Sequence, residues 1–72
     1  MSAIVECQVP GNIWKVLVKP GDAVKEGDVL FIMEVMKTEV PHAAPVDGTV
    51  SEVNVQNDQE GVDAGFAAVV IG

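Results

Sequence analysis

The chain has 72 residues and a net charge of −7, from eleven acidic residues, four lysines and no arginine. This length suits one small domain, residues 1–72, and the acidic excess disfavours nucleic acid and anionic membranes as partners. The single cysteine, Cys7, excludes an internal disulfide, and the absence of a signal-peptide pattern or a membrane-spanning apolar run leads us to expect a cytoplasmic protein.

Valine and isoleucine are abundant, and Gly, Pro, Asn and Asp recur between the apolar segments. This pattern favours strands joined by turns. In chain order, the expected strands cover residues 3–8, 12–18, 29–35, 38–42, 48–55 and 67–71, with short bridging strands at 23–25 and 61–63.

Apolar residues that alternate with polar ones along these strands are expected to form the core. The expected core residues are Val5, Val16, Val18, Val24, Leu30, Ile32, Val50, Val53, Val55, Val69 and Ile71. We expect Cys7 to be half-buried in a strand and Trp14 to pack partly across a sheet. His42, the one histidine, is interpreted as an ordinary strand residue and not as a general base.

The second half of the chain repeats the first. Residues 11–18 align with 48–55, and residues 24–27 align with 62–65 after one extra residue. Neither copy can bury its own apolar face. We therefore predict an all-β flattened sandwich, a barrel-sandwich hybrid, in which an internal pseudo-two-fold axis relates two antiparallel sheets. Lys37 falls at the junction of the copies, so its turn should project from one end.

The chain shows no reaction centre of its own. One histidine cannot supply a His-based metal site, no spacing singles out a pair of acids, and there is no Gly-rich phosphate-binding loop. We expect no catalytic residue, no metal site and no enzymatic activity for the chain alone.

Lys37 stands out because its neighbour at the tip of the expected hairpin is Met36, where Asn or Gly is preferred. Residues 34–40 read Glu-Val-Met-Lys-Thr-Glu-Val, which resembles the attachment site of biotinyl/lipoyl attachment domains. The turns at 21–30 and 44–50 also resemble turns that biotinyl and lipoyl domains share. The sequence departs from the pattern at Val35, where Ala or Ser is usual, and at Thr38, which replaces a second methionine.

This resemblance, strongest to biotin carboxyl carrier proteins and free-standing biotin attachment proteins, implies a biotin carboxyl carrier, either as a free-standing subunit or as a domain of a longer carboxylase. Lys37 would be biotinylated by a biotin protein ligase, with Met36 and Thr38 as flanking recognition residues and Glu34 and Glu39 as weaker ligase contacts. The carrier would shuttle a carboxyl group between a biotin carboxylase and a carboxyltransferase. The alternatives are a lipoyl carrier of an oxo-acid dehydrogenase-type complex, with lipoate on the lysine, and an unmodified β-sheet binding module.

Overall fold

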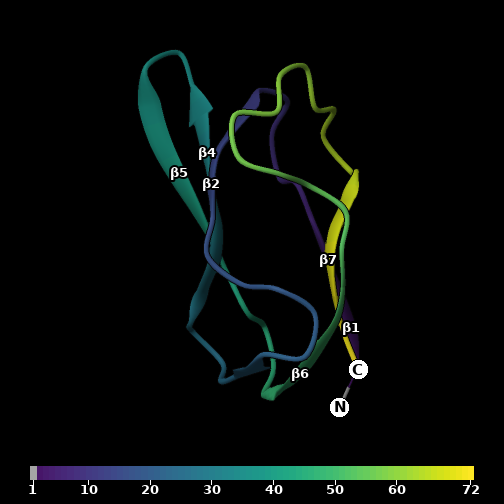
Figure 1. Ribbon diagram of the computed structural model, residues 1–72. Coiled ribbons are helices and arrows are strands. Elements are labelled where there is room, and N and C mark those ends of the chain that lie inside the picture. Colours follow the sequence, from purple (N-terminus) through teal and green to yellow (C-terminus); the bar gives the residue numbers. More distant parts are fainter. Residues whose placement is uncertain (1) are drawn as a thin grey trace.

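Seven strands form two antiparallel sheets in the computed structural model, which describes residues 2–72 (Figure 1). One sheet has the order β1-β7-β6-β3 and the other the order β2-β4-β5. The strands are β1 (Ala3–Glu6), β2 (Asn12–Val16), β3 (Ala23–Val24), β4 (Val29–Val35), β5 (Thr38–Ala43), β6 (Gly48–Val53) and β7 (Ala67–Ile71). The predicted all-β sandwich is confirmed. None of the described residues belongs to a helix that could span a membrane.

The two halves of the internal repeat pair with each other at equivalent positions. Val24 in β3 pairs with Gly48, which begins β6 in the second copy. Val62, the counterpart of Val24, forms an isolated bridge with Gly11, the counterpart of Gly48. Each copy thus completes the sheet edge of the other. The expected strand at 61–63 is therefore reduced to this single bridge.

Corresponding β-bulges support the pseudo-two-fold relation. The register of β2 against β4 shifts between Ile13 and Lys15, and that of β6 against β7 shifts between Val50 and Glu52. These two positions correspond in the repeat. A bulge inserts one unpaired residue and increases the local twist of the sheet.

The start of β1 and the C-terminus lie at one end of the sandwich, and the β4–β5 turn lies at the opposite end (Figure 1). In one sheet the beginning of β1 lies beside the end of β7, where Ala3 pairs with Ile71. In the other sheet the equivalent end of β4 continues through a turn into β5, where Val35 pairs with Thr38. The turn therefore projects away from the end at which the chain enters and leaves the domain.

The core lies between the two sheets and differs in part from the predicted set. Seven of the predicted residues are buried: Val5, Val24, Leu30, Val50, Val55, Val69 and Ile71. The other four are half-buried: Val16, Val18, Ile32 and Val53. The bulges explain the error, because they interrupt the strict alternation on which the prediction was based. Ile13, Phe31 and Met33 point into the core instead, each at most 1% exposed.

Cys7 lies just after β1 and is buried, not half-buried as predicted. Burial raises the pKa of its thiol, because desolvation penalises the thiolate. A protonated, enclosed thiol is a packing residue.

Candidate functional site

Met36 and Lys37 form the two-residue turn between β4 and β5. Their φ angles are 51° and 63°, so both residues are in the left-handed region that a type I′ hairpin turn requires. Met36 is 93% exposed and Lys37 is also exposed. The turn therefore presents the lysine amine and an apolar side chain together, on a hairpin anchored in the three-stranded sheet.

This turn is strained. A left-handed conformation costs roughly 1–2 kcal/mol for each residue other than glycine, and neither Met36 nor Lys37 is a residue that relieves this cost. Such strain persists where the surrounding structure over-determines it and is concentrated at functional sites. The continuous pairing of β4 with β5 on both sides of the turn supplies that constraint.

Two carboxylates oppose each other directly behind the turn. Glu34 in β4 pairs with Glu39 in β5, and both are exposed. Like charges that face each other across a strand pair destabilise a sheet. The structure thus brings the predicted residues Glu34, Met36, Lys37 and Glu39 together at one end of the hairpin, beside Thr38. Their arrangement lowers the stability of the sheet and produces a negative surface close to an amine.

Gly11 allows the start of β2 to approach the strand that leads into the turn. A β-carbon at Gly11 would lie 2.8 Å from Val35 Cγ2 and 2.9 Å from the Glu34 carbonyl oxygen. These distances are shorter than van der Waals contact, so only glycine fits without a shift of β4. Close packing at this point fixes the base of the hairpin that carries Lys37.

His42 connects the hairpin to the segment that follows β1. The Gln8 N–H donates to His42 Nε2 at 3.0 Å, and Nδ1 donates to the Val40 carbonyl at 3.1 Å. The ring also stacks on Phe31, with the ring centroids 4.4 Å apart. Both nitrogens are therefore engaged with the backbone, and the neutral tautomer with hydrogen on Nδ1 satisfies both bonds. His42 therefore links β5 to the segment just after β1.

The pH dependence of stability should report this link. Burial lowers the pKa of His42 below its usual 6.5, against a smaller opposing effect of the Val40 carbonyl. Between the lowered pKa and 6.5 the unfolded chain binds more protons than the folded chain. The free energy of unfolding should therefore be greatest above pH 6.5 and fall as the pH drops below it, by no more than about 1.4 kcal/mol per pH unit for one proton.

Urea unfolding at several pH values between 8 and 5 measures this slope. His42→Asn should remove most of the slope in this window while lowering stability at every pH, because it removes the titrating ring and its stacking on Phe31. An unchanged slope in the variant would mean that another group titrates.

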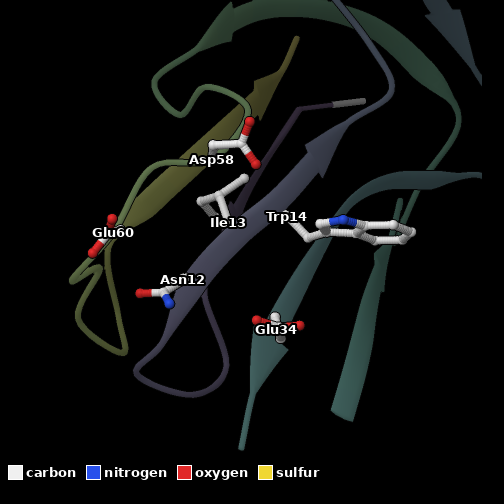
Figure 2. Close-up of a pocket in the computed structure, with 6 residues that line it drawn as sticks. All are labelled: Asn12, Ile13, Trp14, Glu34, Asp58 and Glu60. Atoms are coloured by element: carbon white, nitrogen blue, oxygen red, sulfur yellow. The ribbon is translucent and has the colours of Figure 1, made fainter. Parts of the chain in front are cut away.

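A second feature near the turn was not anticipated from the sequence. A shallow pocket of about 320 Å³ lies beside β2 and β4 (Figure 2). It is lined by Asn12, Ile13, Trp14, Glu34, Asp58 and Glu60. Figure 2 shows Trp14 and Glu34 on neighbouring strands, with Asp58 and Glu60 on a loop that passes β2. Asp58 and Glu60 are far from Trp14 in sequence, so no local pattern could have grouped them.

Residues 2–72 contain no group of three or more His, Cys, Asp and Glu side chains placed to hold a metal ion. What the site offers chemically is one exposed primary amine on a rigid, strained turn, bordered by carboxylates. An amine of this kind is an acceptor for acylation.

Comparison with known proteins shows the family to which the chain is similar over almost its whole length. A family model described as biotin-requiring enzyme, Biotin_lipoyl, matches residues 1–71. The biotin/lipoyl attachment protein of Bacillus subtilis is 47% identical over 49 residues, 68% of this chain and 67% of that protein. The biotin carboxyl carrier protein of Streptococcus mutans is 44% identical over 63 residues, 88% of this chain but only 48% of that protein.

The fold of the whole chain also recurs in a solved structure. The Kluyveromyces lactis urea carboxylase contains a region that superposes on all of this chain with a TM-score of 0.89 and 32% sequence identity. This chain covers 6% of that protein. A domain of this kind therefore occurs both in short proteins and within a much longer one.

Proposed function

Because this chain belongs to the biotin/lipoyl attachment family, we propose that Lys37 carries covalently bound biotin and that the chain is a biotin carboxyl carrier. The observation that carries the proposal is the placement of Lys37 on an exposed, strained turn at the end of the sandwich opposite the termini. The chain itself is non-catalytic in this proposal. Its partners are a biotin protein ligase, a biotin carboxylase and a carboxyltransferase.

The residues around Lys37 fit this role. The amine is mostly protonated at neutral pH, as lysines are, so a ligase must supply the acyl group in activated form and remove a proton. The strained turn, held by the pairing of β4 with β5, fixes the backbone at Lys37, which reduces the ordering that the ligase must impose. Met36 provides an apolar contact beside the amine, with Thr38 on its other side, and Glu34 and Glu39 provide charged contacts behind the turn.

Biotin, when bound, supplies a ureido nitrogen that carries a carboxyl group between two active sites. The chain contributes placement. The hairpin keeps the attachment point clear of the sandwich, and the tether raises the effective concentration of the cofactor at both partners. Amide formation removes the charge of Lys37 and makes the net charge one unit more negative than −7.

A lipoyl carrier is the second candidate, because the similar Bacillus subtilis protein is named a biotin/lipoyl attachment protein. An unmodified binding module is the third. The intact mass of the protein purified from its own cells separates the three, because it shows a biotinyl increment, a lipoyl increment or none. We expect the biotinyl increment, with peptide mapping placing it on Lys37. A lipoyl increment or an unmodified mass would contradict the proposal.

Met36 should influence which ligase accepts the chain. Met36→Asp introduces a charge next to the amine, which a biotin ligase would have to desolvate. We expect the labelling rate to fall by roughly ten-fold, the effect of about 1.4 kcal/mol, and we expect a lipoate ligase to accept the variant better than the wild type. Time courses with each purified ligase measure both rates.

Folding should not confound this result, because aspartate adopts the left-handed conformation more readily than most residues. Met36→Asn is the matched control, since it has a similar shape and backbone preference but no charge. Equal loss of biotin labelling in both variants would show that the methionine contact, and not the charge, governs recognition.

A further inference from the structure

The two ends of the sandwich are built alike but carry different side chains. Trp14 is the bulged residue of β2, and the corresponding bulge in β6 carries Ser51. Trp14 is 43% exposed. In the repeat, Asn12 corresponds to Thr49 and Glu34 corresponds to Gly72. Glu34 pairs with Asn12, and the Gly72 N–H likewise donates to the Thr49 carbonyl. The fold thus accommodates a serine and a glycine at the end near the termini. It does not itself require a tryptophan and a glutamate at the lysine end.

Hydrogen bonds from backbone N–H groups, two of them to asparagine side chains, hold the acidic loop of the pocket against β2. The Ile13 N–H donates to the Gln59 carbonyl at 2.7 Å, and the Val16 N–H donates to Asn57 Oδ1 at 2.7 Å. The Gly61 N–H donates to Asn12 Oδ1 at 3.1 Å. These three bonds bracket Asp58 and Glu60, so the loop that carries both residues is held against β2 before any partner arrives.

The carboxylates of this pocket differ from those that stabilise turns elsewhere. Asp22, Asp28 and Asp47 each accept a backbone N–H at 2.7–3.0 Å. The hydrogen bonds within residues 2–72 leave the carboxylates of Glu34, Asp58 and Glu60 unused. Three acids and an exposed indole around one hollow are therefore available to a ligand.

The ring of Trp14 already contacts a cation. The Lys15 amine lies 5.8 Å from the ring centroid, within the range of a cation–π contact. An arginine side chain suits the hollow better, because its planar guanidinium stacks on aromatic faces and pairs with carboxylates through several N–H groups. The chemistry of the pocket is complementary to arginine.

We propose that the acidic hollow formed by Trp14, Glu34, Asp58 and Glu60 docks an arginine-bearing surface of the biotin carboxylase that acts on the cofactor. This inference rests on the proposed biotin attachment at Lys37. It extends that proposal by assigning a partner-binding surface on the body of the domain, behind the turn.

The position of the hollow favours the carboxylase over the ligase. A ligase must close on the lysine amine and therefore contacts Met36 and Lys37 directly. A carboxylase instead receives the end of a long arm, so its active site meets the ring and not the turn. Its contacts with the carrier must therefore come from surfaces set back from Lys37. Trp14, Asp58 and Glu60 lie in such a surface, beyond Glu34, which the ligase also contacts in the proposed function. The added negative charge of the acylated form also favours a basic partner.

The test measures carboxylation of the biotinylated protein by the biotin carboxylase of the same cells, as a function of carrier concentration. Asp58→Asn combined with Glu60→Gln should raise the KM for the carrier by roughly five-fold, with kcat unchanged, because two exposed charge pairs are lost. The effect should shrink at high salt. Glu26→Gln combined with Glu52→Gln removes the same charge outside the hollow and should leave KM unchanged.

Trp14→Ser provides a second, independent variant. It installs the residue that the corresponding bulge tolerates at Ser51, so folding should be retained while the KM rises by a similar factor. Thermal unfolding of each variant verifies the fold.

The outcomes separate this inference from the proposed function. An unchanged KM in a protein that carries biotin on Lys37 would overturn the docking surface alone. Slower labelling by the ligase with an unchanged carboxylase KM would assign the hollow to the ligase and also overturn it. An equal KM rise in the control pair would show that net charge alone governs the encounter, which again contradicts a specific site. Absence of biotin from Lys37 would instead overturn the proposed function.

Discussion

Lys37→Arg is expected to abolish biotin attachment completely while leaving the fold intact. Arginine keeps the positive charge and the length of the side chain, but its guanidinium stays protonated and does not form the amide. The backbone at position 37 should be unaffected, because φ there is 63° and the two side chains have the same branching. Incubation with biotin ligase, ATP and biotin, followed by intact-mass analysis, measures the loss.

The other three lysines supply the matched control. Lys15, Lys19 and Lys25 lack the strained turn and its flanking residues. A variant with all three replaced by arginine should be labelled to the wild-type extent. The unfolding free energy of Lys37→Arg should stay within about 0.5 kcal/mol of wild type, as is usual for exposed positions. Label found on Lys25, or lipoate found on Lys37 of the native protein, would overturn the assignment.

Phe31→Ala should have the largest effect on stability. Phe31 is fully buried in β4, stacks on His42 and lies in the middle of the core. Truncating a buried phenylalanine to alanine typically costs about 3–5 kcal/mol. A domain of this length has a total stability of roughly 4–11 kcal/mol, so the variant should be largely destabilised and should melt at least roughly 12 °C lower. Urea and thermal unfolding followed by circular dichroism measure the change.

Phe66, the other phenylalanine of the chain, is the natural control because it is 40% exposed. Phe66→Ala should cost much less, since most of the penalty comes from the cavity left in a packed interior. If the two variants were destabilised equally, the burial of Phe31 could not be the cause. Because Phe31 also supports the His42 ring, its loss should in addition flatten the pH dependence of stability below pH 6.5.

The Lys37 end of the sandwich contains two features that lower the free energy of unfolding. The turn holds two non-glycine residues in left-handed conformations, and Glu34 faces Glu39 across the strands behind it. Both features are unfavourable for folding. A protein tolerates such features where function requires them, and here they surround the proposed attachment point. Met36→Asn, the uncharged control above, should therefore also raise the unfolding free energy slightly.

The amino-acid sequence alone was sufficient for the architecture. Alternation of apolar residues predicted the strands, and the alignment of Gly11 with Gly48 and of Val24 with Val62 predicted a two-fold pair of sheets. The expected strands 29–35 and 38–42 also predicted the two-residue turn at Met36 and Lys37. These features depend on local periodicity and on a repeat, and both are properties of the linear chain.

Only the tertiary structure decided which side chains enter the core and which acids gather beside Trp14. Bulges in β2 and β4 turned Ile13 and Phe31 inward, and a bulge is set by pairing with a partner strand, not by the strand's own sequence. The link from His42 to Gln8 and the approach of Asp58 to Trp14 join residues more than thirty positions apart. Such contacts depend on how the sheets pack together, which one-dimensional periodicity does not encode.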